Sequence, residues 1–175
     1  NIYFGKKWCK MAENTLKKRK LVDKILKFIQ DDEIIVIHGS RQVGKTSLIK
    51  YLIDNHLKNI SDPGNIFYFD LEDFILLELC NSTPEEVLSY LKAKNADLSK
   101  KIYLLIDEIQ YLKNPSSFLK LFHDRYKGKI KLIVSGSTSM LIKKKLDVAL
   151  VGRTVDFELF TLDFEEFLDF KGLSY

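Results

Sequence analysis

One glycine-bounded segment constrains the fold of this chain more than any other feature. Residues 39–46 read Gly-Ser-Arg-Gln-Val-Gly-Lys-Thr, which matches the Walker A pattern of phosphate-binding loops in full. The apolar, β-branched run 33–38 precedes the segment, and a helical pattern from Lys45 to about Leu57 follows it. A glycine turn without a ligand is the alternative, and the flanking strand and helix argue against it.

Each position of this phosphate loop has a chemical reason. Glycines allow backbone N–H groups to turn inward around phosphate oxygens, and the positive end of the following helix faces the same anion. We expect Lys45 to reach the β- and γ-phosphates and Thr46 to bind Mg²⁺ through its hydroxyl. The expected nucleotide-binding residues are Gly39, Ser40, Arg41, Gln42, Val43, Gly44, Lys45, Thr46 and Ser47.

A second motif follows further along the chain. The apolar run that starts at Ile102 ends in two acids, Asp107 and Glu108, which is a Walker B pattern. Asp107 would hold the hydration shell of Mg²⁺, and Glu108 would polarise the attacking water as a general base. The alternative is an ordinary strand end with solvated acids. Together with the phosphate loop upstream, the pair favours ATP hydrolysis.

Hydrophobic periodicity predicts strands that alternate with helices, which indicates an α/β protein. The specific expectation is a three-layer P-loop NTPase with a parallel five-stranded sheet and helices on both faces. A glutamate after the magnesium aspartate suggests the class with an extra strand between the two Walker strands, hence the strand order 5-1-4-3-2. Residues 71–80 fit either a helix or a loop. The predicted strands are 33–38, 65–70, 101–107, 129–135 and 155–161, and the predicted helices are 12–30, 45–57, 84–94, 115–127, 138–145 and one from about 163.

Three further polar positions are candidates for catalysis. Ser135 and Ser137 end the fourth strand between the two Walker elements, where a hydroxyl could contact the γ-phosphate or the attacking water. The alternative is a turn whose hydroxyl caps the next helix. Arg153 precedes the fifth strand and could stabilise transition-state charge, in its own chain or in a neighbouring copy, or it is a surface arginine. Arg41 points either to a partner or to solvent.

Composition narrows the class of partner. The 28 basic and 24 acidic residues give a net charge of +4, which permits an acidic partner without demanding one. The lysine-rich runs 17–20 and 143–145 fit a solvated helix face or a nucleic-acid patch. The two cysteines lack metal or redox spacing, and no apolar run approaches the roughly 20 residues of a membrane span. We therefore expect a cytoplasmic protein without a membrane partner.

Several segments together resemble a known family. They are residues 39–49, 105–112 (LIDEIQYL), 134–141, 150–153 (LVGR) and 160–168 (FTLDFEEFL). In this order they resemble the AAA-like P-loop ATPases of bacteria and archaea that carry a C-terminal domain of unknown function. The resemblance implies an ATPase core, ATP with Mg²⁺, and a cytoplasmic location, and Arg153 matches the arginine of the family's Gly-Arg pair. Ser40 departs from the proline common in relatives, without loss of a phosphate donor.

These observations lead to one expected organisation and a small set of functions. Residues 1–11 are expected to be an N-terminal extension, either foreign to the natural protein or left by a truncation, and residues 12–175 the ATPase domain, with the C-terminal domain missing. The expected function is Mg²⁺-dependent ATP binding and hydrolysis by a switch or motor, with a homo-oligomer left open. The alternatives are a nucleotide-binding interaction module with little turnover and a nucleic-acid-dependent ATPase. An arginine-rich lid and an Asn-Lys-x-Asp motif are missing, which disfavours a small-molecule kinase and a GTPase.

Overall fold

A single parallel sheet organises the protein. The computed structural model describes residues 16–137 and 150–173, and within them five strands pair in the order β2-β3-β4-β1-β5. This confirms the predicted order 5-1-4-3-2 and the α/β fold class. The strands are β1 (Ile34–Gly39), β2 (Ile66–Asp70), β3 (Ile102–Asp107), β4 (Ile130–Ser137) and β5 (Thr154–Glu158).

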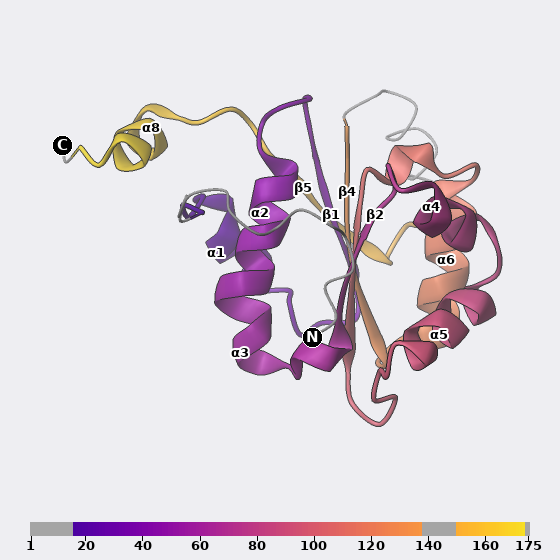
Figure 1. Ribbon diagram of the computed structural model, residues 1–175. Coiled ribbons are helices and arrows are strands. Elements are labelled where there is room, and N and C mark those ends of the chain that lie inside the picture. Colours follow the sequence, from indigo (N-terminus) through magenta and orange to yellow (C-terminus); the bar gives the residue numbers. More distant parts are fainter. Residues whose placement is uncertain (1–15, 138–149, 174–175) are drawn as a thin grey trace.

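Helices cover both faces of the sheet, so the fold has three layers. Figure 1 shows α1, α2 and α3 on one face and α4, α5 and α6 on the other. A π-helical turn (Ile53–Leu57) joins α2 to α3. Within the described ranges, no helix is both long and apolar enough to cross a bilayer. The helices are α1 (Leu21–Leu26), α2 (Lys45–Leu52), α3 (Lys58–Ile60), α4 (Phe74–Asn81), α5 (Pro84–Ala93), α6 (Pro115–Tyr126) and α8 (Phe164–Lys171).

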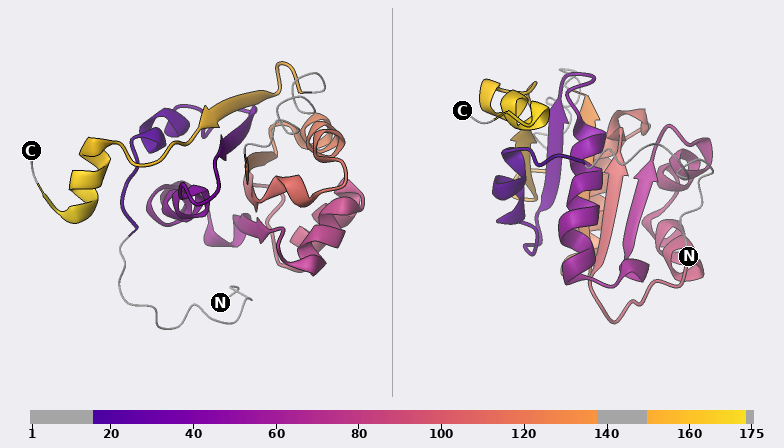
Figure 2. Two further views of the ribbon diagram at one scale, coloured as in Figure 1. Left: turned by 90° about the horizontal axis from the view of Figure 1, so that it is seen from above. Right: turned by 60° about the vertical axis from the view of Figure 1, so that its left-hand side comes forward.

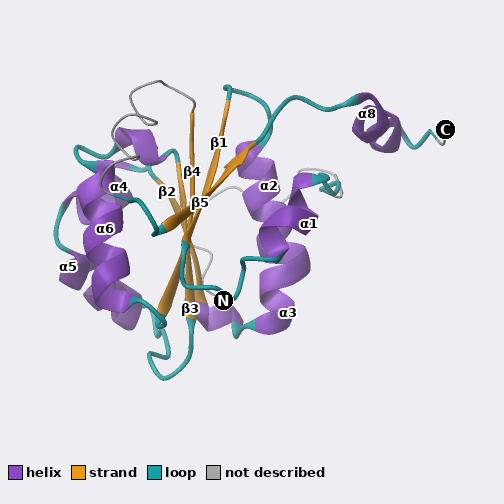
Figure 3. Ribbon diagram, turned by 180° about the vertical axis from the view of Figure 1, so that it is seen from behind, coloured by secondary structure: helices purple, strands orange, loops and turns teal. Residues whose placement is uncertain are grey.

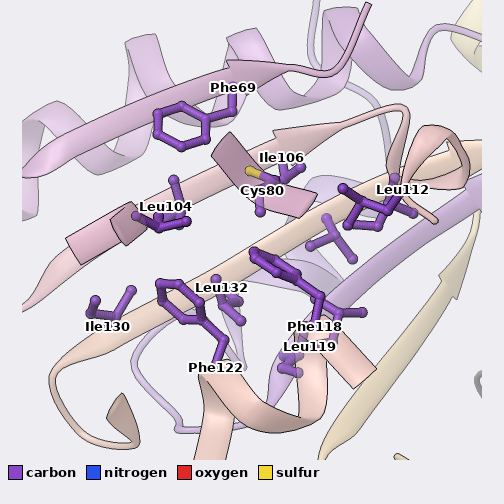
Figure 4. Close-up of a cluster of buried hydrophobic side chains, with 14 of the residues drawn as sticks. Phe69, Cys80, Leu104, Ile106, Leu112, Phe118, Leu119, Phe122, Ile130 and Leu132 are labelled. Atoms are coloured by element: carbon purple, nitrogen blue, oxygen red, sulfur yellow. The ribbon is translucent and has the colours of Figure 1, made fainter. Parts of the chain in front are cut away.

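Two hydrophobic cores, one on each face, hold the layers together. Successive side chains of a strand point to opposite faces, so Leu104 and Leu105 of β3 enter different cores. Figure 4 shows the core under α4 and α6, where Leu104 and Leu132 of the sheet meet Phe118 of α6. Because the central strands are buried on both faces, they appear in the sequence as continuous apolar runs rather than as alternating patterns.

Polar caps fix where several helices start. Asp73 accepts hydrogen bonds from the backbone N–H groups at the start of α4, which resolves the ambiguous segment 71–80 as a helix. Thr83 caps α5 as predicted, and Asn114 caps α6. Asp163 and Glu166 form a reciprocal capping box at the start of α8. Local side-chain chemistry therefore sets these boundaries.

Two predicted elements are shorter than expected. The helix predicted for residues 12–30 is limited, among the described residues, to Leu21–Leu26. Buried Lys131 of β4 donates to the carbonyl groups of Phe28, Asp31 and Glu33, which keeps that segment in turns. The strand predicted for 155–161 ends at Glu158. The predicted helix 138–145 and the lysine run 143–145 lie outside the described residues.

Candidate nucleotide-binding site

The phosphate loop begins where β1 ends and leads directly into α2. Gly44 has a φ of 98° and Gln42 a φ of 65°, so the loop turns through left-handed conformations that favour glycine. Gly39 is required for a different reason, because a Cβ atom there would lie 2.3 Å from the carbonyl oxygen of Leu159. The predicted strand–loop–helix arrangement is confirmed.

Lys45 is buried at the start of α2 and its ammonium group lies within the loop. Its Nζ donates to the carbonyl groups of Gly39 at 3.1 Å and Ser40 at 2.9 Å. Val43 packs into the core beneath the loop. The remaining predicted binding residues lie on one short segment of chain, and Ser40, Arg41, Gln42 and Ser47 are exposed.

The two Walker motifs meet at the carboxyl-terminal ends of the parallel strands. Thr46 Oγ1 donates a hydrogen bond of 2.6 Å to Asp107 Oδ2, although the residues are 61 positions apart. The strand order explains the contact, since β4 alone separates β1 from β3. A hydroxyl and a carboxylate side by side are the protein oxygens that Mg²⁺ uses beside nucleotide phosphates. The residues present therefore fit a magnesium site.

Asp107 is fully enclosed and accepts hydrogen bonds on both oxygens. Oδ2 also accepts from Tyr68 Oη at 3.0 Å, while Oδ1 accepts from Ser135 Oγ and from the backbone N–H of Glu108. These donors supply hydrogen-bond partners for both oxygens of the buried carboxyl group. Burial and the nearby Asp107 carboxylate raise the pKa of Tyr68, so its phenol stays protonated and can donate.

Tyr68 was missed by the sequence reasoning, although a signal for it existed. It lies on β2, the strand beside β3, and Tyr68 pairs in register with Leu105. A tyrosine two residues before the end of a strand next to β3 can reach Asp107, the residue predicted to hold Mg²⁺. That inference needs the strand order as well as the sequence.

Glu108 follows Asp107 in a left-handed backbone conformation with a φ of 58°. Its carboxylate accepts a hydrogen bond from Gln110 Nε2, and the Gln110 Oε1 atom accepts from the backbone N–H of Ser137 at 3.2 Å. Gln110 therefore connects the predicted general base to the end of β4. Gln110 lies in the DEIQ segment, but no role had been predicted for its side chain.

The structure separates the two serines that were predicted as sensors. Ser135 is buried against Asp107, which places its hydroxyl in the site. Ser137 is the last residue of β4 and its backbone contacts Gln110, while a capping role for its hydroxyl would involve residues beyond those described.

Arg153 lies at the amino-terminal ends of the strands, whereas the phosphate loop lies at their carboxyl-terminal ends. Its carbonyl group accepts a hydrogen bond from the N–H of Ile34, at the start of β1, at 2.8 Å. Its guanidinium pairs with Asp124 of α6 at 2.8 Å and lowers the pKa of that carboxyl group to about 2. Five residues of β1 separate Ile34 from the loop, or about 17 Å. Arg153 therefore does not lie beside Lys45 of its own chain.

Solved structures share this fold at low sequence identity. The Aeropyrum pernix ORC1 protein in complex with DNA matches 92% of this chain and 51% of its own, with a TM-score of 0.66 and 10% identity. A DNA polymerase III gamma subunit-related protein from Thermotoga maritima matches 85% of this chain and 48% of its own, with a TM-score of 0.56 and 11% identity. At these identities, the likeness concerns the fold alone.

Sequence comparison adds uncharacterised relatives and a family. A protein of Methanocaldococcus jannaschii is 29% identical over 160 residues, covering 90% of this chain and 33% of the relative. A Haemophilus influenzae protein is 26% identical over 164 residues, covering 94% of this chain and 40% of the relative. The chain thus spans a third to two fifths of these relatives. The AAA domain model matches residues 31–168, and the chain therefore belongs to the AAA domain family.

Proposed function

We propose that this chain binds ATP with Mg²⁺ and hydrolyses it. The observation that carries the proposal is the hydrogen bond between Thr46 and Asp107, beside a buried Lys45 at the start of α2. These three groups would be the magnesium and phosphate ligands of a P-loop site, and the fold brings them together from the start of α2 and the end of β3. AAA family membership supports the same class of activity.

The residues of the site divide the chemistry among them. Lys45 would exchange its carbonyl partners in the loop for phosphate oxygens, because those anions are stronger acceptors. When bound, Mg²⁺ neutralises charge on the phosphates, and Thr46 and Asp107 are placed to hold it. Glu108 would accept the proton of the attacking water once its carboxylate is released from Gln110. Ser135 keeps Asp107 oriented.

Arg153 would complete the site only from a neighbouring copy. The phosphate loop and Arg153 lie at opposite ends of the strands, so a head-to-tail contact between copies could bring the two together. A guanidinium supplied in this way stabilises transition-state charge on the γ-phosphate. The proposal therefore includes a homo-oligomer as the active form.

The test is steady-state phosphate release from MgATP as a function of protein concentration. We expect slow turnover whose specific activity rises with concentration, and we expect Glu108→Gln to abolish turnover while nucleotide binding persists. Phosphate release that equals the buffer blank at every concentration, despite bound ATP, would refute hydrolysis by this chain.

A mixing experiment separates the two locations of the arginine. Lys45→Ala has an intact Arg153 but a damaged phosphate loop, and Arg153→Ala has the reverse. If Arg153 acts on a neighbour, a mixture of the two inactive variants regains part of the activity. If Arg153→Ala alone remains fully active, Arg153 has no role in catalysis.

A nucleotide-binding module with little turnover is the second candidate. It is favoured by the hydrogen bond that Gln110 makes to Glu108 and by the distance of Arg153 from the phosphate loop. Because the structurally similar ORC1 protein was solved in complex with DNA, the phosphate-release assay should also be run with added duplex DNA. Stimulation by DNA would support a nucleic-acid-dependent ATPase, and unchanged turnover would argue against it.

A further inference from the structure

The buried side chain of Arg19 joins three separate parts of the chain. Its Nη1 atom donates to the carbonyl of Val43 in the phosphate loop at 3.0 Å, and its Nη2 atom donates to the carbonyl of Phe160 at 2.9 Å. Its Nε atom donates to Glu166 Oε1 of α8 at 3.0 Å. Arg19 is only 7% exposed and Glu166 only 6%. The sequence reasoning placed Arg19 in a lysine-rich run on a solvated face or nucleic-acid patch, and neither describes this residue.

The contact with Val43 controls one of the expected phosphate donors. The peptide unit between Val43 and Gly44 is planar and trans, so its carbonyl and N–H groups point in opposite directions. With the carbonyl held by Arg19, the N–H of Gly44 faces away from Arg19. A charge-assisted hydrogen bond of this kind is strong and buried here, so it fixes the orientation of the peptide unit before any ligand arrives.

The other end of Arg19 holds α8. Glu166 is the only buried residue of that helix, and Figures 1 and 3 show α8 set apart from the sheet, beyond α1 and α2. The start of the described chain runs beside α8, as Figure 2 shows: Lys17 Nζ donates to the carbonyl of Asp169, and Lys20 pairs with Asp163. These exposed contacts are individually weak. The buried Arg19–Glu166 pair is therefore the main described attachment of α8 to the phosphate loop.

We propose that Arg19 is a positioning residue that couples the phosphate loop to α8, so that nucleotide binding and the docking of α8 strengthen each other. The proposal rests on the proposed function insofar as the ligand is a nucleotide. Coupling between two sites is reciprocal in free energy. A nucleotide that rigidifies the loop should thus also stabilise α8, and loss of the α8 contact should loosen the loop.

The first experiment needs no nucleotide. Hydrogen exchange of the amides in residues 39–47 is compared between the wild-type chain, Arg19→Met and Glu166→Gln. We expect exchange in the loop to become about tenfold faster in Arg19→Met, because a buried charge-assisted hydrogen bond is lost. Lys131→Met is the matched control for general destabilisation, since Lys131 is a buried cation that also donates to three carbonyls, but at the amino-terminal ends of β4 and β1, away from the phosphate loop. Equal exchange in the loop of all four proteins would overturn the proposal.

The second experiment measures the coupling itself. Addition of MgATP to the wild-type chain should slow amide exchange in residues 164–171, and this protection should disappear in Glu166→Gln, which retains the shape of the side chain. Nucleotide affinity should fall about tenfold in Arg19→Met and stay unchanged in Lys131→Met. Protection of α8 that persists in Glu166→Gln would refute the coupling.

The two proposals fail in different ways. A wild-type chain that binds no nucleotide refutes the proposed function, while the exchange of the empty loop still decides the role of Arg19. If Arg19→Met does not fold, Glu166→Gln carries both experiments, because it removes the charge of the pair and keeps the hydrogen-bond acceptor.

Discussion

Lys131→Met should destabilise the protein strongly, although the residue is far from the phosphate loop. Lys131 is completely buried in β4, and its Nζ donates to the carbonyl groups of Phe28 at 2.6 Å, Asp31 at 2.8 Å and Glu33 at 2.5 Å. Methionine has a similar volume and keeps the packing of the stem, but it cannot donate a hydrogen bond. The change therefore isolates the cost of losing the ammonium group.

The magnitude follows from what each carbonyl retains. Phe28 also accepts from the backbone N–H of Asp31 at 3.3 Å, so its carbonyl keeps one donor. The carbonyls of Asp31 and Glu33 lose a charged donor, and a hydrogen bond to a charged group contributes about 1.5–3 kcal/mol. Relief from burying a charge offsets part of this cost; burial lowers the pKa of Lys131 to about 8. We expect a net loss of about 3 kcal/mol in the free energy of unfolding, or roughly 6–12 °C in Tm.

The assay is urea and thermal unfolding followed by circular dichroism, with Lys129→Met as the control. Lys129 lies two residues earlier and is exposed, so its substitution should change the free energy of unfolding by less than about 0.5 kcal/mol. If Lys131→Met also stays within about 0.5 kcal/mol of the wild type, the buried ammonium does not hold this loop and the reasoning is wrong.

Three further predictions concern the site and its supports. Tyr68→Phe removes one hydrogen bond to the buried Asp107 and should lower the free energy of unfolding by about 1.5 kcal/mol, measured by urea denaturation. Gly39→Ala should cost about 2 kcal/mol or more, because the new Cβ would overlap the carbonyl oxygen of Leu159 at 2.3 Å; thermal unfolding measures this loss. Burial raises the pKa of Glu166, but hydrogen bonds from Arg19 and two backbone N–H groups outweigh it and the pKa is lowered. Glu166 should therefore contribute stability above its unfolded pKa of about 4.5, and this contribution should be lost as the pH falls through the lower folded value; Tm measured against pH in Glu166→Gln should lack that component.

Matched controls separate these effects from general damage. Tyr111→Phe removes a hydroxyl from a ring that is 47% exposed and should leave stability unchanged. Gly64→Ala adds a Cβ whose nearest neighbour is 3.4 Å away and should be tolerated. If Tyr68→Phe behaves like Tyr111→Phe, the phenol does not support Asp107. Equal Tm values for Gly39→Ala and Gly64→Ala would contradict the steric argument, and parallel pH profiles for wild type and Glu166→Gln would contradict the linkage.

Much of the fold was predictable because its determinants are local. The apolar run of β3 fixes a buried strand, Asp73 and Thr83 cap helices through hydrogen bonds to residues two or three positions away, and Gly44 adopts a backbone conformation that glycine favours. The strand order followed from the phosphate loop together with the Asp107–Glu108 pair. Such signals are contained within a few residues, so periodicity and motif spacing reveal them.

Within the described residues 16–30, the predicted helix was too long for the opposite reason. Its periodicity is real, since Val22, Ile25 and Ile29 are all buried. Helical propensity alone is a weak determinant, however, and among the described residues tertiary contacts overrode it on both sides of α1. Arg19 donates hydrogen bonds to the phosphate loop and to α8. Three carbonyl groups after Lys27 accept hydrogen bonds from Lys131.

The sequence by itself determined the candidate groups of the site: Lys45 and Thr46 at the end of a Walker A segment, and a buried strand that ends at Asp107 and is followed by Glu108. Only the tertiary structure decided which side chains surround that chemistry. Tyr68 and Gln110 enter the site, whereas Arg153 lies at the amino-terminal ends of the strands, away from the phosphate loop. Arg19 reaches Glu166, which is 147 positions away in the sequence. The physical reason is range, because a motif is defined by neighbours along the chain, whereas a hydrogen bond depends only on distance in space.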